Sequence, residues 1–334
     1  MATLTLDAAA ALVVDALTRC GAAPEAAAST ARALVGAEAD GLKGHGLSRV
    51  PSYAAQVRAG KVLGDAAVTV EHPRPGLVAI DAGHGFAYPA LDRAVAALPA
   101  LARAQGIAAA GIRRSHHCGA AGRPCEALAE EGLVAILMAN TPAAMAPWGG
   151  RTPVFGTNPV AFACPLPAKD GIRRPPVVVD LSLSKVARGN VVAAKQRGEP
   201  IPEGWALDAE GRPTTDPAAA LAGTMIPLGD AKGTALALMV ELLAAGLVGG
   251  RYAAEASSFL DTEGGPPGTG QLLIAIDAGA FDPAAPARFA VLAAAIEAQE
   301  GARLPGARRL ALRARAASEG VAVPDALLAE IRAL

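Results

Sequence analysis

The sequence predicts a mixed α/β fold in which a helical layer, built from the two ends of the chain, surrounds an α/β centre. Two observations support this prediction. Helical apolar periodicity occupies both ends of the chain, and short apolar runs typical of strands alternate with helical patterns between them. The chain has 334 residues, of which 52% are hydrophobic, so it can bury a sizeable core and is long enough for about two domains.

The predicted elements follow one another without an internal repeat. Helices are expected at 6–19 and 24–40, where Gly21 and Gly41 mark their ends. A turn-rich stretch follows between Pro51 and Pro75. Beyond it, strands are predicted at 77–81, 107–112, 133–138, 177–180 and 272–277, and helices at 91–105, 125–131, 232–246 and 286–299. A last helix, 324–334, is expected to pack back on the opening pair.

Composition and charge exclude several classes of partner. The net charge is −1 and only 3% of the residues are aromatic, so neither nucleic acid nor an anionic membrane is an expected partner. Asp7 and Asp15 interrupt the apolar N-terminus, which therefore predicts an amphipathic helix rather than a signal peptide. The longest apolar run, 235–248, contains Glu241 and is too short to span a bilayer.

The four cysteines, Cys20, Cys118, Cys125 and Cys164, show no CxxC spacing. In a chain of this length with a real core, this pattern favours a reduced, cytoplasmic protein without a disulfide framework. The spacing of Cys118, Cys125 and His117 does not match a zinc site, so no metal is expected.

The common nucleotide-binding and hydrolase motifs are absent. No predicted strand runs into G-x-G-x-x-G, because the segment that begins at Gly83 lacks the third glycine. The segment that begins at Gly229 has the wrong spacing for a phosphate-binding loop. Neither G-x-S-x-G nor H-E-x-x-H occurs. A nucleotide would therefore need a less common scaffold.

His45 lies between Gly44 and Gly46, and Arg49 follows four residues later. A helical turn here would place the guanidinium beside the imidazole. A general acid with a pKa near neutrality, next to a group that binds a carboxylate with two hydrogen bonds, is what reduction of a 2-oxo or 2-imino acid requires. The alternative is a loop in which His45 and Arg49 only cap a helix.

Four further segments could contact a phosphate, a ribose or a carboxylate. The segment 113–122 links a predicted strand to a predicted helix, and its small residues would let backbone N–H groups approach an anion. The segments 155–159 and 180–184 carry hydroxyl and amide groups at strand ends. Three arginines surround a turn in 303–309 and could bind a phosphate. Each segment also fits an ordinary turn.

Together and in order, these motifs resemble the type 2 malate/L-lactate dehydrogenase family, which is unrelated to the Rossmann-fold lactate dehydrogenases. The resemblance covers nearly the whole chain. Its motifs are His45-Gly, Arg49-Val-Pro-Ser-Tyr53, Ser115-His-His117, Phe155-Gly-Thr-Asn-Pro159, Gly204-Trp-Ala-Leu-Asp208, Pro213-Thr-Thr-Asp-Pro217 and Leu304-Pro-Gly306.

The resemblance implies a fold, an assembly and a cofactor. Residues 76–304 would form a non-Rossmann NAD(P)-binding α/β domain with a mixed, largely antiparallel sheet. Residues 1–75 and 305–334 would form a helical domain for substrate binding and dimerisation, and the chain would work as a homodimer. Members of the family reduce 2-oxo acids or cyclic imino acids with NADH or NADPH. The arginines of 303–309 favour NADPH here, with NADH as the alternative.

The family's functional residues carry over by position. His45 would be the catalytic proton donor, with Asn190 or Asp180 orienting its ring. Arg49, Thr157 and His117 would bind a substrate that carries a carboxylate. The cofactor-binding residues would come from four segments: His117, Cys118, Gly119, Ala120 and Ala121; Asp180, Leu181 and Ser182; Lys232; and Arg303, Gly306, Arg308 and Arg309.

Within the family, the chain looks closest to the ketimine reductases of Δ1-piperideine-2-carboxylate and Δ1-pyrroline-2-carboxylate. The supporting segments are 81–91, 116–117, 270–277 and 303–309. Two positions depart from the pattern: Gly44 replaces the usual Ser before the catalytic His, and Asn190 replaces the Asp of the ketimine branch.

The expected activity is reduction of a cyclic 2-imino acid with NAD(P)H to an L-amino acid such as pipecolate or proline. Within the family, the alternative is a 2-hydroxy acid dehydrogenase acting on malate, lactate, sulfolactate or ureidoglycolate. A catalytically inactive homologue that still binds the cofactor is a third reading.

Overall fold

The centre of the molecule is a seven-stranded sheet. The computed structural model describes residues 1–334, and the strand order is β2-β3-β4-β11-β5-β6-β7. The strands are β2 (Thr69–Arg74), β3 (Leu77–Asp81), β4 (Ile107–Ser115), β5 (Leu133–Ala139), β6 (Val160–Cys164), β7 (Val177–Leu181) and β11 (Thr269–Asp277). Only β3 and β4 run parallel, and every other neighbouring pair is antiparallel. The expected mixed, largely antiparallel sheet is confirmed.

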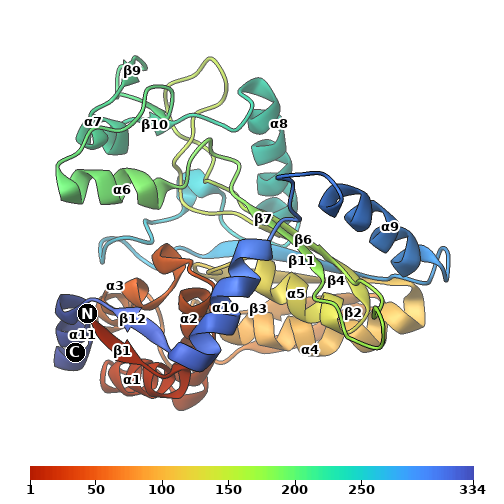
Figure 1. The fold of residues 1–334 in the computed structure, drawn as a ribbon. Helices are drawn as coiled ribbons and strands as arrows, with labels where there is room; N and C mark the ends of the chain where they lie inside the picture. The colour runs from red at the N-terminus through yellow and green to blue at the C-terminus, as the bar shows by residue number, and fades with distance from the viewer.

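Helices cover both faces of this sheet (Figure 1). One face packs on α4 (Ala87–Gln105) and α5 (Gly122–Glu130), and its core joins Ala110 and Ile112 of β4 with Leu98 of α4. The other face packs on α8 (Ala231–Val240), which continues as a π-helical turn, η3 (Glu241–Gly246). Because the central strands β5 and β11 are covered on both faces, their sequences are nearly continuous apolar runs. All five strands predicted from such runs lie in the sheet.

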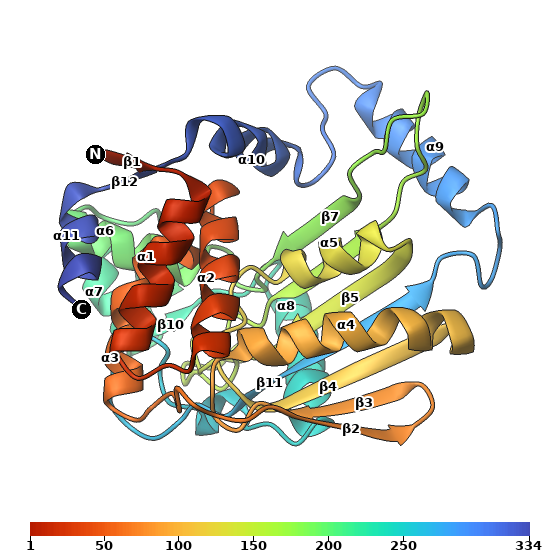
Figure 2. The ribbon, with the colours of Figure 1, turned by 90° about the horizontal axis from the view of Figure 1, so that it is seen from below.

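The two ends of the chain build a separate core. It joins α1 (Leu6–Arg19), α2 (Pro24–Ala39), α3 (Val50–Arg58) and α11 (Asp325–Ala333). Strand β1 (Ala2–Leu4) pairs antiparallel with β12 (Val321–Val323), so the termini lie side by side. The prediction that the last helix packs on the opening helices is confirmed, since Leu328 and Ile331 share a core with Leu17. Helix α10 (Ala307–Glu319) runs from this layer towards β7 (Figure 2).

A third group of short elements lies above the sheet in Figure 1. It contains α6 (Arg188–Arg197), α7 (Pro217–Ala222), β8 (Ala206–Leu207), β9 (Pro213–Thr214) and β10 (Thr224–Met225). Two further elements are η4 (Ala253–Glu255) and α9 (Ala285–Glu297), and α9 lies at the side of the molecule. No helix is long and apolar enough to cross a membrane.

The turn-rich stretch predicted between Pro51 and Pro75 contains two regular elements. Pro51 lies in the first turn of α3, where the missing N–H group has no intrahelical partner to lose. Pro73 lies in β2, which is an edge strand and therefore tolerates proline. Helix α4 begins at Ala87 rather than near 91, with Pro89 in its first turn. The sequence predicted turns at Pro51 and Pro73, whereas the structure has the first turn of a helix at Pro51 and an edge strand at Pro73.

Candidate active site

His45 and Arg49 lie on two consecutive 3-10 turns directly after α2, η1 (Lys43–His45) and η2 (Leu47–Arg49). The Nε atom of Arg49 donates a hydrogen bond to the carbonyl oxygen of Gly44 at 2.7 Å. The guanidinium is thereby held beside the imidazole, as a helical turn at this spacing would predict. Its positive charge contributes to the lowered pKa of His45.

A buried glutamate holds these turns in place. The carboxylate of Glu38, on α2, accepts a hydrogen bond from Lys43 Nζ at 2.6 Å and another from the backbone N–H of Leu47 at 3.0 Å. The chain between them passes so close that a Cβ atom on Gly46 would lie 2.1 Å from Glu38 Oε2. Only glycine fits this approach, and Glu38 therefore positions the loop that carries His45.

The imidazole of His45 stacks on that of His117. The ring centroids are 5.2 Å apart and the ring planes differ by 18°. Burial and the charge of Arg49 lower the pKa of His45 to about 4, and the same two causes lower the pKa of His117 well below its ordinary value. Both rings are therefore neutral at pH 7. The Nδ1 atom of His45 is enclosed and has no hydrogen-bond partner.

Arg49 has no carboxylate partner. None of the chain's ion pairs includes it, and its only side-chain hydrogen bond is the one to Gly44. An arginine beside two neutral imidazoles leaves a positive charge without a counter-charge. The planar guanidinium favours a carboxylate that can accept two parallel hydrogen bonds. The arrangement can therefore bind a carboxylate next to an imidazole that exchanges a proton.

An aromatic side chain from a distant loop covers one side of His117, which is stacked on His45 (together, the histidine pair), and of its neighbour His116. Phe259 packs against His116 and His117, with ring centroids 4.8 and 5.4 Å away. Gln56 donates to the carbonyl oxygen of Phe259 at 2.8 Å, and its own oxygen lies 2.8 Å from His116 Nε2. Sequence reasoning missed Phe259 and Gln56. The only signal in the sequence was that aromatic residues make up just 3% of the chain, so each aromatic residue could have been considered individually.

Three of the predicted cofactor-binding segments lie together at the edge of the sheet. Residues 118–121 lie in the connection between β4 and α5, and the first N–H group of α5, on Gly122, donates to Asp180 Oδ2 at 2.8 Å. Leu181 and Ser182 follow Asp180 at the end of β7. The turn before α10 lies over the same strand, because a Cβ atom on Gly306 would be 3.4 Å from the carbonyl oxygen of Val178. Burial raises the pKa of Asp180, while Gly122 and Arg309 oppose the shift.

The three arginines of the 303–309 segment have different surroundings. Arg309 donates to Glu126 on α5 at 3.0 Å, and its side chain is 11% exposed. Arg303 and Arg308 are exposed and have no hydrogen-bond or ion-pair partner within the chain. Lys232, in the first turn of α8, is exposed as well. Arg303, Arg308 and Lys232 are therefore available to an anionic ligand, whereas Arg309 is already engaged.

Thr157 lies in a loop that a buried carboxylate organises. Its N–H group donates to Thr141 Oγ1 at 2.9 Å. The neighbouring Asn158 donates to Glu241 at 2.8 Å, and Glu241 also accepts from Asn140 and from the N–H group of Ala253. Glu241 is 3% exposed, and burial raises its pKa despite these hydrogen bonds. The sequence signal was present, since Glu241 is the one charge in the longest apolar run.

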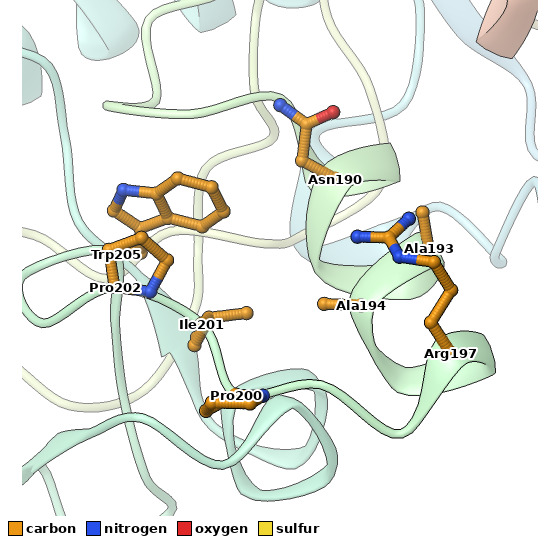
Figure 3. Close-up of a pocket in the computed structure, with 8 residues that line it drawn as sticks. All are labelled: Asn190, Ala193, Ala194, Arg197, Pro200, Ile201, Pro202 and Trp205. Atoms are coloured by element: carbon orange, nitrogen blue, oxygen red, sulfur yellow. The ribbon is translucent and has the colours of Figure 1, made fainter.

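None of the hydrogen bonds or ring contacts described above involves Asn190. It sits near the start of α6, is exposed, and its side chain makes no hydrogen bond. It lines a pocket of about 210 Å³ together with Arg197, Ile201 and Trp205 (Figure 3). None of His45, Arg49 and His117 lines this pocket. Asp180, the other residue predicted to orient His45, accepts the hydrogen bond from Gly122 instead, and its charge does not contribute to the pKa of His45.

No group of three or more His, Cys, Asp or Glu side chains is placed to hold a metal ion. The four cysteines are free and buried. Burial, with a smaller contribution from Asp180, raises the pKa of Cys118 to about 12. The Cys118 thiol, next to His117 in the sequence, is therefore protonated near neutral pH in the free chain.

Comparison with known proteins identifies the family of the chain. A family model described as malate/L-lactate dehydrogenase matches residues 4–332. The (2R)-3-sulfolactate dehydrogenase (NADP(+)) of Chromohalobacter salexigens is 53% identical over 322 residues, which cover 96% of this chain and 95% of that protein. A Delta(1)-pyrroline-2-carboxylate/Delta(1)-piperideine-2-carboxylate reductase of Pseudomonas aeruginosa is 42% identical over 338 residues, which cover 100% of this chain and 99% of that protein.

A solved structure has the same fold. The delta1-piperideine-2-carboxylate reductase from Pseudomonas syringae pv. tomato superimposes with a TM-score of 0.92 at 37% sequence identity, covering 100% of this chain and 99% of that one. The family model and these relatives extend over nearly the whole chain. The chain belongs to the malate/L-lactate dehydrogenase family and is an oxidoreductase.

Proposed function

We propose that the chain is an NADP-dependent 2-hydroxy acid dehydrogenase of the 3-sulfolactate type. The observation that carries the proposal is the guanidinium of Arg49, which has no carboxylate partner and lies beside the neutral imidazole of His45. This pair matches a substrate whose carboxylate neighbours a carbon that is reduced or oxidised. The 53% identity to a sulfolactate dehydrogenase favours this branch over imine reduction.

Each group of the site has a role in this proposal. Arg49 holds the substrate carboxylate, which offsets the positive charge that helps to keep His45 neutral, so that His45 takes up a proton when substrate binds. The resulting imidazolium gives this proton to the 2-oxo oxygen during reduction, and the neutral ring takes it back during oxidation. Thr157 and His117 complete the substrate contacts. The nicotinamide cofactor, when bound, supplies or accepts the hydride. We also propose that Asn190 orients His45 during the reaction, although the free chain shows no hydrogen bond between them. Replacement of Asn190 by Asp should then raise the pKa of His45.

The cofactor segments fit a dinucleotide. Gly119 and Gly122 leave no room for side chains, since a Cβ atom on Gly119 would lie 2.8 Å from Tyr88 Oη and one on Gly122 would lie 3.0 Å from Asp180 Cβ. These contacts hold the turn 117–121 against α4 and β7, and we propose that its backbone N–H groups meet a phosphate at the start of α5. Asp180, Leu181 and Ser182 would meet the ribose, while Lys232, Arg303 and Arg308 would meet phosphates. We propose NADPH rather than NADH because two arginines of this turn have no partner.

A second guanidinium supports a substrate with two anionic groups. Arg188, at the start of α6, belongs to no ion pair, and burial lowers its pKa. It donates to the carbonyl oxygen of Ala143 at 3.3 Å. Ala143 lies two residues after Thr141, whose hydroxyl lies 3.4 Å from that of Thr157. A sulfonate on the substrate would supply the counter-charge that Arg188 lacks.

Reduction of a cyclic 2-imino acid is the second candidate function. Reductases of pyrroline- and piperideine-2-carboxylate are about as long as this chain and 42% identical, and one shares its fold with a TM-score of 0.92. Gly44 and Asn190 depart from the pattern of that branch. A Cβ atom on Gly44 would meet nothing within 4 Å, so the structure could accommodate the missing serine.

Oxidation of reduced nicotinamide separates the two candidates. We expect the purified chain to oxidise NADPH with 3-sulfopyruvate at a kcat/KM at least about tenfold above those with pyruvate, oxaloacetate, Δ1-pyrroline-2-carboxylate and Δ1-piperideine-2-carboxylate. Replacement of Arg188 by Gln should raise the KM for 3-sulfopyruvate and leave the KM for pyruvate unchanged. Turnover of the cyclic imino acids alone would overturn the proposal in favour of the second candidate.

We also propose a cytoplasmic homodimer in which residues 1–75 and 305–334 bind substrate and residues 76–304 bind NAD(P). The separate hydrophobic core of the chain ends supports the division, and the four buried free cysteines support a reducing compartment. Leu242, Leu247, Val291 and Leu292 are exposed apolar side chains on η3, directly after it, and on α9. A second copy of the chain would therefore cover these side chains as well as part of the helical layer. The molar mass in solution tests the assembly.

A further inference from the structure

Two tyrosines connect to the histidine pair through hydrogen bonds that the proposed function does not use. Tyr53 is fully buried and Tyr88 is 4% exposed. Their hydroxyl oxygens are 3.1 Å apart, and Tyr53 Oη lies 2.6 Å from Nδ1 of His117. No other side-chain hydrogen bond involves either hydroxyl. The three side chains therefore form a linear series of hydrogen bonds, from Tyr88 through Tyr53 to His117, which we call the hydrogen-bond chain.

Counting protons gives this chain a direction. If Tyr88 donates to Tyr53 and Tyr53 donates to His117 Nδ1, each hydroxyl proton has an acceptor. In the opposite direction, His117 Nδ1–H donates to Tyr53 and Tyr53 donates to Tyr88. The proton of the Tyr88 hydroxyl then has no acceptor in a buried place, which is unfavourable. The first direction satisfies every group.

All three groups of the hydrogen-bond chain keep one protonation state near neutral pH. Burial raises the pKa of Tyr53 to about 12 and raises that of Tyr88 well above its ordinary value, so both hydroxyls stay protonated near neutral pH. Burial and Arg49 keep the ring of His117 neutral. A neutral imidazole carries one proton, and when Nδ1 accepts a hydrogen bond that proton must be on Nε2.

We propose that Tyr88 and Tyr53 are positioning residues that hold His117 as the Nε2–H tautomer, so that His117 donates a hydrogen bond to an oxygen of the substrate. The Nε2 atom makes no hydrogen bond within the chain and is not among the enclosed polar atoms that lack a partner, so it is open to the site. The ring stacks on His45, which places this donor beside the proton-transferring group. The identity of the acceptor as a substrate oxygen rests on the proposed function.

The packing around Tyr88 supports a positioning role. A Cβ atom on Gly119 would lie 2.8 Å from Tyr88 Oη and 2.9 Å from its Cε1. Gly119 also has a φ of 69°, in the left-handed region that favours glycine. The backbone directly after His117 therefore presses on Tyr88. The same contact that fixes the turn fixes the hydroxyl that starts the hydrogen-bond chain.

The tautomer can be measured without substrate. In protein labelled with ¹⁵N-histidine, two-bond ¹H–¹⁵N correlation spectra distinguish Nδ1–H from Nε2–H, and with five histidines the loss of one set of signals in His117→Gln assigns His117. We expect the Nε2–H form in the unsubstituted chain and in Tyr88→Phe, because Tyr53 can still donate in that variant. In Tyr53→Phe we expect a mixture of both forms. An Nδ1–H form in the unsubstituted chain, or an unchanged tautomer in Tyr53→Phe, would overturn the proposal.

Kinetics tests the functional half. Tyr53→Phe should lower kcat/KM roughly 3- to 10-fold on the best substrate, the size of one neutral hydrogen bond. Tyr252→Phe, a matched change on an exposed tyrosine outside the site, should leave it unchanged. A normal kcat/KM in Tyr53→Phe with a mixed tautomer would show that the Nε2–H donor is not used. Because the tautomer is read in the free protein, a wrong substrate assignment leaves that half of the test intact.

Discussion

Arg49 and Arg313 both lie near the C-terminal end of α2, but their surroundings are opposite. Arg313 donates to both carboxylates of a buried cluster, Asp40 and Glu126, which also hold Arg123 and Arg309. We call these five residues the ion network. Hydrogen bonds to Asp40 and Glu126 raise the pKa of Arg313 above its ordinary value. Arg49 has no carboxylate at all and instead lowers the pKa of neighbouring histidines.

The different surroundings of Arg313 and Arg49 distinguish an arginine that stabilises the fold from one that is available to a ligand. In the ion network, α10 and α2 from the chain ends are joined to α5 of the sheet, and the charges are compensated within the chain. Around Arg49, the charge is left for a ligand to compensate, and the rings beside it stay neutral. A guanidinium that is partly buried next to carboxylates holds the fold, whereas one partly buried next to neutral rings marks a binding site.

The largest expected effect is the loss of catalysis when His45 is removed. His45→Ala should lower kcat by a factor on the order of 10²–10⁴, the usual contribution of a general acid. The free energy of unfolding should change little, because no hydrogen bond of the chain ends on this ring. Steady-state kinetics and a denaturant titration measure the two quantities. Activity within a factor of about two of the parent would reject His45 as the proton donor.

The opposite pattern is expected in the ion network. The side chain of Asp40 is fully buried and accepts hydrogen bonds from Arg123 and Arg313 at 2.6–2.9 Å. Asp40→Asn removes the charge partner of Arg123 and one of the two carboxylates that bind Arg313, so the free energy of unfolding should fall by about 3–5 kcal/mol. Asp15→Asn, in an exposed pair with Arg19, should change it by less than about 1 kcal/mol. Equal stability of the two variants would contradict the structural role of the network.

A smaller effect is expected when Arg49 keeps its charge but loses its shape. Arg49→Lys retains a cation and loses the planar pair of N–H donors, so KM for the 2-oxo acid should rise on the order of tenfold. The fall in kcat should be smaller and the unfolding midpoint should stay the same. An unchanged KM would place the substrate carboxylate elsewhere, and a lowered unfolding midpoint would assign Arg49 to the fold.

The sequence predicts the local half of this comparison and misses the long-range half. His45 and Arg49 are four residues apart, so any helical turn brings them together, and this could be predicted. Arg308 and Arg309 look alike in the sequence, but only Arg309 meets Glu126, which is 183 residues away along the chain. The stacking of His45 on His117 and the contacts of Tyr53 and Phe259 likewise depend on tertiary packing, which local patterns do not specify.

The same distinction holds for the fold. Strands buried on both faces have continuous apolar sequences, and those at 133–138 and 272–277 were predicted within a few residues of β5 and β11. Helix α3 and strand β2 were missed because Pro51 and Pro73 resemble turn signals. Proline is tolerated in the first turn of a helix and in an edge strand. The elements packed around a proline decide whether it lies in the first turn of a helix, in an edge strand or in a turn.

The pKa of His45 tests the central claim most directly, namely that Arg49 is a charge reserved for the substrate. In the free protein, burial and Arg49 hold this pKa at about 4. A carboxylate bound to Arg49 cancels the positive charge, so a non-reactive 2-oxo acid analogue should raise the pKa of His45 and be accompanied by proton uptake. Arg49→Met should raise the pKa without the analogue, and the analogue should add nothing further. Titration of the His45 ring by NMR measures all three states. A pKa near 6.5 in the free protein, unaffected by Arg49→Met and by the analogue, would contradict the account.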